Sequence, residues 1–216
     1  MSEMSVFIAE SVSPVDFYIG RTDGRAAFEV VRLHQVRCEY RVVLDRLRLK
    51  KAVREALKGD FGVFHLSCHG ADDGVRLSDG TDLSWTELAE ILKPLASVDR
   101  LLVMACCSGG YAGLATELRK AGAVFGYVFG STAEAGVTFT HSCLAWSALY
   151  NGLIEGKFTR KGVQKTIDRI NGIAIGDFVY RRWGGAKYLH YPVVSQALPP
   201  KPISSARPAT ASLRLR

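Results

Sequence analysis

The stretch DRLLVMACCSGGYAG, residues 99–113, decides the fold of this chain. Its apolar run over residues 101–104 is typical of a fully buried strand, and the run is followed by Cys106 and Cys107 at the start of a glycine-containing turn. A helical pattern over residues 112–121 comes next. In open α/β sheets, ligands bind at the carboxyl ends of the strands. The stretch therefore predicts a thiol at the ligand-binding edge of a sheet.

A second stretch, FGVFHLSC at residues 61–68, ends in the same way. This buried-strand pattern is followed by His69 and Gly70 and then by a polar loop at residues 71–74. Two neighbouring strands would place His69 beside a cysteine. Because an imidazole can act as a general acid or base and a thiolate is a nucleophile, the pair indicates nucleophilic catalysis.

The rest of the chain alternates strand and helix patterns. We expect residues 11–24 to be a turn-rich connection. Further strands are expected at residues 5–9, 38–45, 123–129 and, as an edge strand, 188–194. Further helices are expected at residues 26–34, 46–58, 85–92, 138–153 and 161–173, the third with a capping-box spacing from Ser84 to Glu87. Because parallel strands need crossover helices, this order predicts a mostly parallel sheet with helices on both faces.

Length and composition predict one domain. A chain of 216 residues, 48% of them hydrophobic, can bury one core and is short for two. We place this domain at residues 1–197. Residues 198–216, LPPKPISSARPATASLRLR, have little to bury and are expected to be a disordered basic tail. The alternative for this segment is a docking or processing segment for a partner.

Cysteine usage and charge indicate the cellular compartment and the kinds of partner to expect. The five cysteines are odd in number and unevenly spaced, and the sequence shows neither a signal peptide nor an apolar run of transmembrane length. We therefore expect a cytoplasmic protein without a membrane partner. The net charge of +7 comes from scattered basic residues without aromatic interleaving, so we expect no nucleic-acid partner.

At the two strand ends the chain resembles the caspase-like cysteine proteases, and most closely the CHAT subgroup, which also resembles separase. The resemblance rests on His69-Gly70 and on ACCSG at residues 105–109, and covers about residues 4–195. It is supported by three later segments, which resemble a short hairpin and a later strand, loop and helix: LSDG at 77–80 with Leu83, residues 126–132, and residues 139–153. The resemblance implies a caspase-like three-layer α/β sandwich with a mostly parallel central sheet.

The same resemblance implies a function. Cys106 would be the nucleophile of an endopeptidase that forms an acyl-enzyme, and His69 would be its acid and base. The backbone N–H groups of Gly70 and Cys106 would form the oxyanion hole. Substrates would be proteins, no cofactor or metal would be needed, and activity would be switched by a partner or by cleavage in a signalling or defence system. The alternative is a catalytically silent caspase-fold module that binds partners.

Several candidate residues have a structural interpretation as well. Cys107 adjoins Cys106, and the family register assigns the nucleophile to Cys106. Cys38, Cys68 and Cys143 are expected to be core residues, as is His65, which lies inside the strand. A metal site is the competing chemistry, and its ligands would come from His65, Cys68, His69, Cys106 and Cys107.

The residues expected to set cleavage specificity differ from those of the proteases that the chain resembles. Strict caspases carry glutamine two residues before the nucleophile and metacaspases carry aspartate, whereas this chain has Met104 there. Separase-like members carry acids in a loop that matches residues 130–137, where this chain has only Glu134. One carboxylate in a partly enclosed pocket favours a basic residue, so we expect cleavage after arginine or lysine. A solvated role for Glu134 is the alternative.

Overall fold

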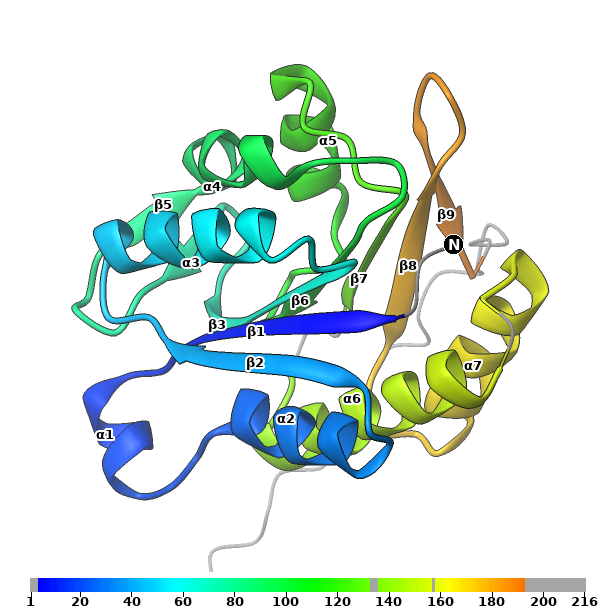
Figure 1. Ribbon diagram of the computed structural model, residues 1–216, viewed down its shortest axis with the longest axis horizontal. Coiled ribbons are helices and arrows are strands. Elements are labelled where there is room, and N and C mark those ends of the chain that lie inside the picture. The colour runs from blue at the N-terminus through cyan, green and yellow to red at the C-terminus, as the bar shows by residue number, and fades with distance from the viewer. Residues whose placement is uncertain (1–3, 133–135, 157, 193–216) are drawn as a thin grey trace, which may run out of the picture.

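A nine-stranded mixed sheet forms the centre of the computed structural model, which describes residues 4–132, 136–156 and 158–192 (Figure 1). The main path of the sheet runs β2-β1-β3-β6-β7-β8-β9. Its first five strands are parallel: β1 (Ser5–Ser11), β2 (Arg37–Val42), β3 (Val63–Gly70), β6 (Leu101–Ala105) and β7 (Tyr127–Ser131). Its last two strands are antiparallel: β8 (Phe178–Trp183) and β9 (Tyr188–Tyr191). A small antiparallel extension continues from β3 through β4 (Gly74–Arg76) and β5 (Asp82–Ser84).

Helices cover both faces of the sheet (Figure 1). One face carries α3 (Arg46–Lys58), α4 (Trp85–Leu92) with a 3-10 turn at Lys93–Leu95, and α5 (Ala112–Ala121). The other face carries α2 (Asp23–Leu33), α6 (Phe139–Glu155) and α7 (Arg160–Gly172). A short helix, α1 (Pro14–Tyr18), follows β1. The arrangement confirms the predicted α/β class, with a mostly parallel sheet between two helical layers.

The core is divided by the sheet into two clusters. Every residue of β1 and β6 is buried, because strands covered by helices on both faces hide both sets of alternating side chains. Phe7, Phe64 and Met104 pack toward α3, α4 and α5, whereas Ile8, Val103 and their neighbours pack toward α2 and α6. This alternation sends Cys68 and Cys106 into the first cluster.

Three helices have the bounds expected from the sequence, namely α3, α4 and α5. The capping box of α4 is present, with reciprocal hydrogen bonds between Ser84 and Glu87. The strand expected at residues 61–67 instead runs from Val63 to Gly70. It is longer because His69 and Gly70 pair with Arg76 and Val75 of the hairpin β4–β5.

Two elements were not expected from the sequence. Residues 11–24 are not only turns, because helix α1 forms there, and β8 occupies residues for which no strand was expected. The expected edge strand is β9, which ends at Tyr191, and its remaining expected residues from 193 onward lie outside the described residues. The tail at residues 198–216 also lies outside them.

None of the helices in the described part of the chain is both long and apolar enough to cross a membrane.

Candidate active site

The turn after β6 holds Cys106 at the carboxyl edge of the sheet. Cys106 follows the last residue of the strand and is buried. Ser108 adopts the left-handed conformation, with φ of 61°, and its hydroxyl donates a hydrogen bond to Asp72 at 3.0 Å. The backbone N–H of Gly110 donates to Ser131 at 2.8 Å, and Arg181 donates twice to the carbonyl of Gly110. These bonds to neighbouring segments fix the turn that presents the thiol.

Backbone surrounds the sulfur of Cys106 closely, and two glycines make this possible. A Cβ atom on Gly70 would lie 3.1 Å from the Cys106 sulfur and only 2.1 Å from the carbonyl oxygen of Cys107. A Cβ atom on Gly109 would lie 2.9 Å from the same sulfur. Neither position has room for a side chain. The structure therefore brings together Gly70 and Cys106, the two residues whose N–H groups were expected to form the oxyanion hole.

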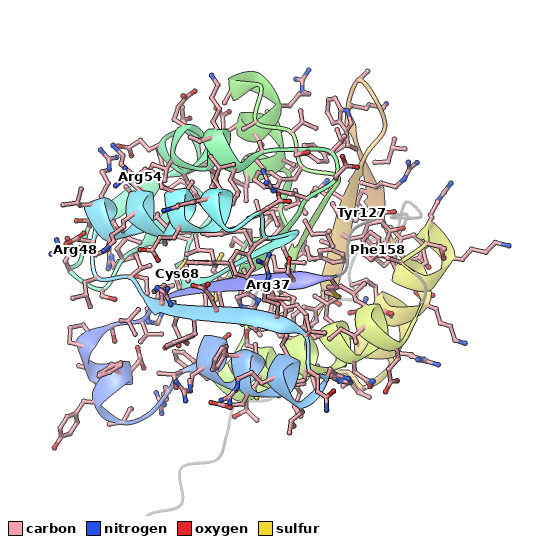
Figure 2. The ribbon with its side chains drawn as sticks, in the orientation of Figure 1. Arg37, Arg48, Arg54, Cys68, Tyr127 and Phe158 are labelled. Atoms are coloured by element: carbon pink, nitrogen blue, oxygen red, sulfur yellow. The ribbon has the colours of Figure 1, made fainter. Side chains whose placement is uncertain are left out.

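Cys68 contacts Cys106 from the adjacent strand. The last registered pair of β3 and β6 is Ser67 with Ala105, and the two cysteines are the residues that follow this pair in the chain. A side-chain hydrogen bond with Cys106, together with burial, raises the pKa of Cys68 well above its ordinary value. Cys68 thus lies in the core, as expected, between the sheet and its helices (Figure 2). It also contacts the candidate nucleophile.

His69 points toward the other face of the sheet and meets Asp16. Its Nε2 atom lies 2.9 Å from Oδ2 of Asp16, and its ring stands edge-on to Phe139, the first residue of α6, with centroids 6.0 Å apart. The imidazole is half-exposed, whereas the Asp16 side chain is only 13% exposed. A carboxylate at this distance fixes the proton on Nε2 and leaves Nδ1 as the free basic atom.

The local sequence explains why Asp16 is rigid. Ser13 caps α1, Pro14 occupies the first turn, and the Ser13 hydroxyl donates to Oδ2 of Asp16 at 2.5 Å while accepting from the Asp16 N–H at 3.1 Å. The hydrogen bond from Ser13, and after it the one from His69, lower the pKa of Asp16. Arg21 adds an ion pair at 3.7 Å. Asp16 is therefore a carboxylate at neutral pH.

The segment that carries α1 is held at both of its ends. At its start, the Ser11 hydroxyl accepts from the backbone N–H of Ser78 at 3.0 Å. At its end, the buried carboxylate of Glu10 accepts from the N–H groups of Gly24 and Arg25, at 2.8 and 3.1 Å. A fixed α1 keeps Asp16 in reach of His69.

Two buried carboxyl groups lie on the same side of the sheet as His69. The Ser67 hydroxyl, two residues before His69 on β3, donates to Asp23 at 2.5 Å, and the hydroxyl of Tyr40 donates to Glu10 at 2.6 Å. Burial raises the pKa of both Asp23 and Glu10. These groups anchor α2 on β1 and β3, and composition and motif patterns gave no signal for them.

A cleft of about 880 Å³ opens beside His69 and Gly70. Its remaining lining comes from α1, the β4–β5 hairpin and the start of α4: Ser13, Asp16, Ala71, Asp73, Gly74, Val75, Arg76, Asp82, Leu83, Ser84 and Glu87. Cys106 is not among these described lining residues. A peptide in the cleft would contact the imidazole and Gly70, while the thiol lies behind them.

The two members of the expected dyad are not hydrogen-bonded to each other. Within the described residues, the thiol of Cys106 is hydrogen-bonded to Cys68, and the imidazole of His69 is hydrogen-bonded to Asp16. Cys107 is half-buried, and its sulfur faces Gly136 in the segment before α6. The structure brings His69 and Cys106 to adjacent strands, with Gly70 in contact with the thiol.

The other candidate residues lie apart from the cleft. Met104 is fully buried in β6, and Glu134 lies outside the described residues. His65 is fully buried and shares a hydrogen bond of 2.9 Å with the Tyr150 hydroxyl on the face of the sheet opposite Cys68. In the described part of the chain, no three side chains of His, Cys, Asp or Glu are grouped so that they could hold a metal ion.

The sequence interpretation missed Asp16. Its signal was the Ser13-Pro14-Val15-Asp16 pattern, which is typical of a helix start because serine caps, proline fits the first turn and an acid follows three residues later. No protein-family model matches this chain and no curated protein matches it, so its functional assignment rests on the site itself.

Proposed function

We propose that the protein is a caspase-like cysteine endopeptidase of the CHAT type, with Cys106 as its nucleophile and His69 as its acid and base. The observation that carries the proposal is the placement of His69 against Asp16 while the adjacent residue, Gly70, contacts the sulfur of Cys106. A nucleophile, a base and a group that orients the base are the parts that covalent catalysis requires.

The hydrogen bonds of His69 determine which ring nitrogen takes up a proton. Nε2–H donates to the Asp16 carboxylate, so Nδ1 is the atom that takes the proton of Cys106. The resulting thiolate and imidazolium form the reactive pair, and the Asp16 carboxylate stabilises the imidazolium. Asp16 is a positioning residue, because it acts through His69.

The reaction then has two halves. The thiolate attacks the peptide carbonyl, and the oxyanion accepts hydrogen bonds from the N–H groups of Gly70 and Cys106. The imidazolium protonates the leaving amine, which leaves an acyl-enzyme on Cys106. Water, deprotonated by the same imidazole, hydrolyses the acyl-enzyme and restores the thiol.

The resting arrangement needs one change before this chemistry. Because the Cys106 thiol is hydrogen-bonded to Cys68, the Cys106 side chain must rotate away from the core to reach the imidazole. Rotation of one side chain about χ1 is a small motion between staggered wells. Such a step suits a protease that is switched on by a partner or by cleavage.

A partner-binding module without turnover is the second candidate. Two observations favour it. The Cys106 thiol is buried and hydrogen-bonded to Cys68, and the described lining of the cleft contains His69 without Cys106. In that case the cleft would hold a peptide and leave it intact.

A proteome-wide cleavage profile tests the proposal. Wild type, Cys106→Ala and the matched control Cys143→Ala, which changes a cysteine on α6, are each expressed in the same cells, and new protein N-termini are compared. We expect new termini with wild type and Cys143→Ala and none with Cys106→Ala. Termini that persist with Cys106→Ala, or a wild type that captures peptides without cutting them, would overturn the peptidase assignment.

A further inference from the structure

Cys68 and Cys106 lie side by side where two adjacent parallel strands end. Cys68 and Cys106 follow the registered pair Ser67 and Ala105, and both are buried in the same cluster, so their side chains lie on the same face of the sheet. Adjacent strands are about 4.8 Å apart, which is within the range of Cα separations that disulfides span. β6 ends at Ala105, so Cys106 is the first residue after the strand ladder.

We propose that Cys68 and Cys106 form a reversible disulfide when the protein meets hydrogen peroxide, so that Cys68 is a resolving cysteine. The consequence for activity rests on the proposed function, because a disulfide would remove the nucleophile of the peptidase. The sulfur chemistry itself rests only on the placement of the two thiols.

The chemistry balances with peroxide as the oxidant. The Cys106 thiolate attacks one peroxide oxygen, an S–O bond forms, the O–O bond breaks, and the departing hydroxide takes a proton to become water. Cys106 is then a sulfenic acid. The Cys68 sulfur attacks the sulfur of Cys106, an S–S bond forms, the S–O bond breaks, and the proton of Cys68 leaves with the hydroxide as a second water. The two thiols together lose two electrons, and peroxide gains them.

The order of these steps follows from the environments of the thiols. Its hydrogen bond to Cys106 and its burial keep Cys68 protonated, and a protonated thiol reacts slowly with peroxide. Cys106 borders Gly70, which lines the cleft, and the two cysteines are almost equally buried, so protonation of Cys68 rather than access makes Cys106 the first to react. Cys68 is the neighbouring thiol on the same face of the sheet.

Cys107 is the competing partner, and its geometry is less suitable. Although it is adjacent in sequence, its sulfur lies near Gly136, where a Cβ atom would be 3.2 Å away. Its carbonyl oxygen packs against Gly70, where a Cβ atom would be only 2.1 Å away, which restrains the peptide unit after Cys107. A disulfide between Cys106 and Cys107 would have to turn the Cys107 sulfur away from Gly136.

Disulfide mapping by mass spectrometry tests the proposal without any peptidase assay. The full chain is treated with hydrogen peroxide, free thiols are blocked with iodoacetamide, and the protein is digested without reduction. We expect a peptide pair joined through Cys68 and Cys106. This pair should disappear after reduction with dithiothreitol, which should make Cys106 available for alkylation. The control Cys143→Ala should give the same joined pair.

Variants at Cys68 make the result specific. In Cys68→Ala, and in Cys68→Ser as a second variant that keeps a buried hydrogen-bond donor, peroxide should leave Cys106 as a sulfenic acid that dimedone traps, and then as a sulfinic acid that dithiothreitol does not reverse. A disulfide from Cys106 to Cys107, or equal loss of Cys106 alkylation after reduction in wild type and both variants, would overturn the proposal. Disulfide formation in a protein that cuts nothing would overturn only the peptidase function.

Discussion

Nε2 of His69 lies 2.9 Å from Oδ2 of Asp16, a carboxylate that reaches it from a helix 53 residues earlier in the chain. The contact determines which ring nitrogen can exchange protons, because Nε2 is used to orient the imidazole and Nδ1 is left free. The Ser13 hydroxyl bonds to the same carboxylate oxygen and keeps Asp16 in place. Helix α1 is thus part of the candidate active site.

Replacing Asp16 should slow the proposed peptidase reaction without unfolding the protein. In Asp16→Asn the contact distance can be kept while the negative charge is lost, so the imidazolium loses its stabilising partner. We expect kcat/KM for a peptide substrate to fall by about tenfold or more. The pH profile of Cys106 alkylation should change at the same time, because the thiolate and the imidazolium form together.

Arg21→Ala is the matched control for Asp16. The Arg21 guanidinium is exposed and lies 3.7 Å from Oδ1 of Asp16, so removing it should leave the rate of peptide cleavage almost unchanged. An Asp16→Asn variant with the wild-type rate and pH profile would contradict the positioning role.

Gly70→Ala should disrupt the site. Its Cβ atom would lie 2.1 Å from the backbone carbonyl oxygen of Cys107, which cannot move as a flexible side chain can. We expect a loss of about 1–3 kcal/mol in the free energy of unfolding, measured by urea denaturation, and loss of Cys106 alkylation. The control is Gly172→Ala at the end of α7, where no atom outside the local helix backbone lies within 4 Å of the added methyl group, so stability should not fall. Equal effects from both variants would contradict the packing argument.

Acid should destabilise the fold through His65. Burial lowers the pKa of His65 to about 3, and an unfolded histidine has a pKa of about 6.5. The unfolded chain therefore binds more protons between these values, and stability is lost as pH falls, by about 1.4 kcal/mol per pH unit. The raised pKa values of Glu10 and Asp23 act in the opposite direction, because their folded forms take up protons more readily.

His65→Gln isolates the contribution of this histidine. Its free energy of unfolding, measured by urea denaturation at several pH values, should fall less steeply with acid than that of wild type. The same substitution at the partly exposed His34 controls for the change of side chain. Parallel pH curves for wild type and His65→Gln would show that His65 does not contribute to acid sensitivity.

Most of the fold could be predicted from the sequence, because buried parallel strands and amphipathic helices have strong periodicity. The turn after β6 and the position of His69 were predictable for the same reason. Asp16 was not, since a five-residue helix has too few turns to show a period, and only its capping residues mark it. Strand β8 was missed although Gly184 and Gly185 separate two aromatic-rich runs, which is typical of a hairpin. The Glu10 and Asp23 pair depends on tertiary contacts that no local pattern encodes.

Substrate choice is predicted from the sequence at Glu134. If this carboxylate selects the residue before the cut, a peptide library should be cleaved after arginine or lysine, and Glu134→Gln should reduce that preference by about tenfold. Glu155→Gln, which changes an acid at the end of α6, is the control. Cleavage after aspartate, or an unchanged preference in Glu134→Gln, would contradict this prediction.

The dyad is tested most directly by the peptidase rates of four proteins under identical activation: wild type, His69→Ala, Cys106→Ala and the double variant. Because the two groups act as a unit, either single change should abolish nearly all turnover, and the double change should cost little more. Cys107→Ala should retain substantial activity. A Cys106→Ala variant that cuts peptides as fast as wild type would contradict the account, and loss of activity in Cys107→Ala alone would place the nucleophile one residue later.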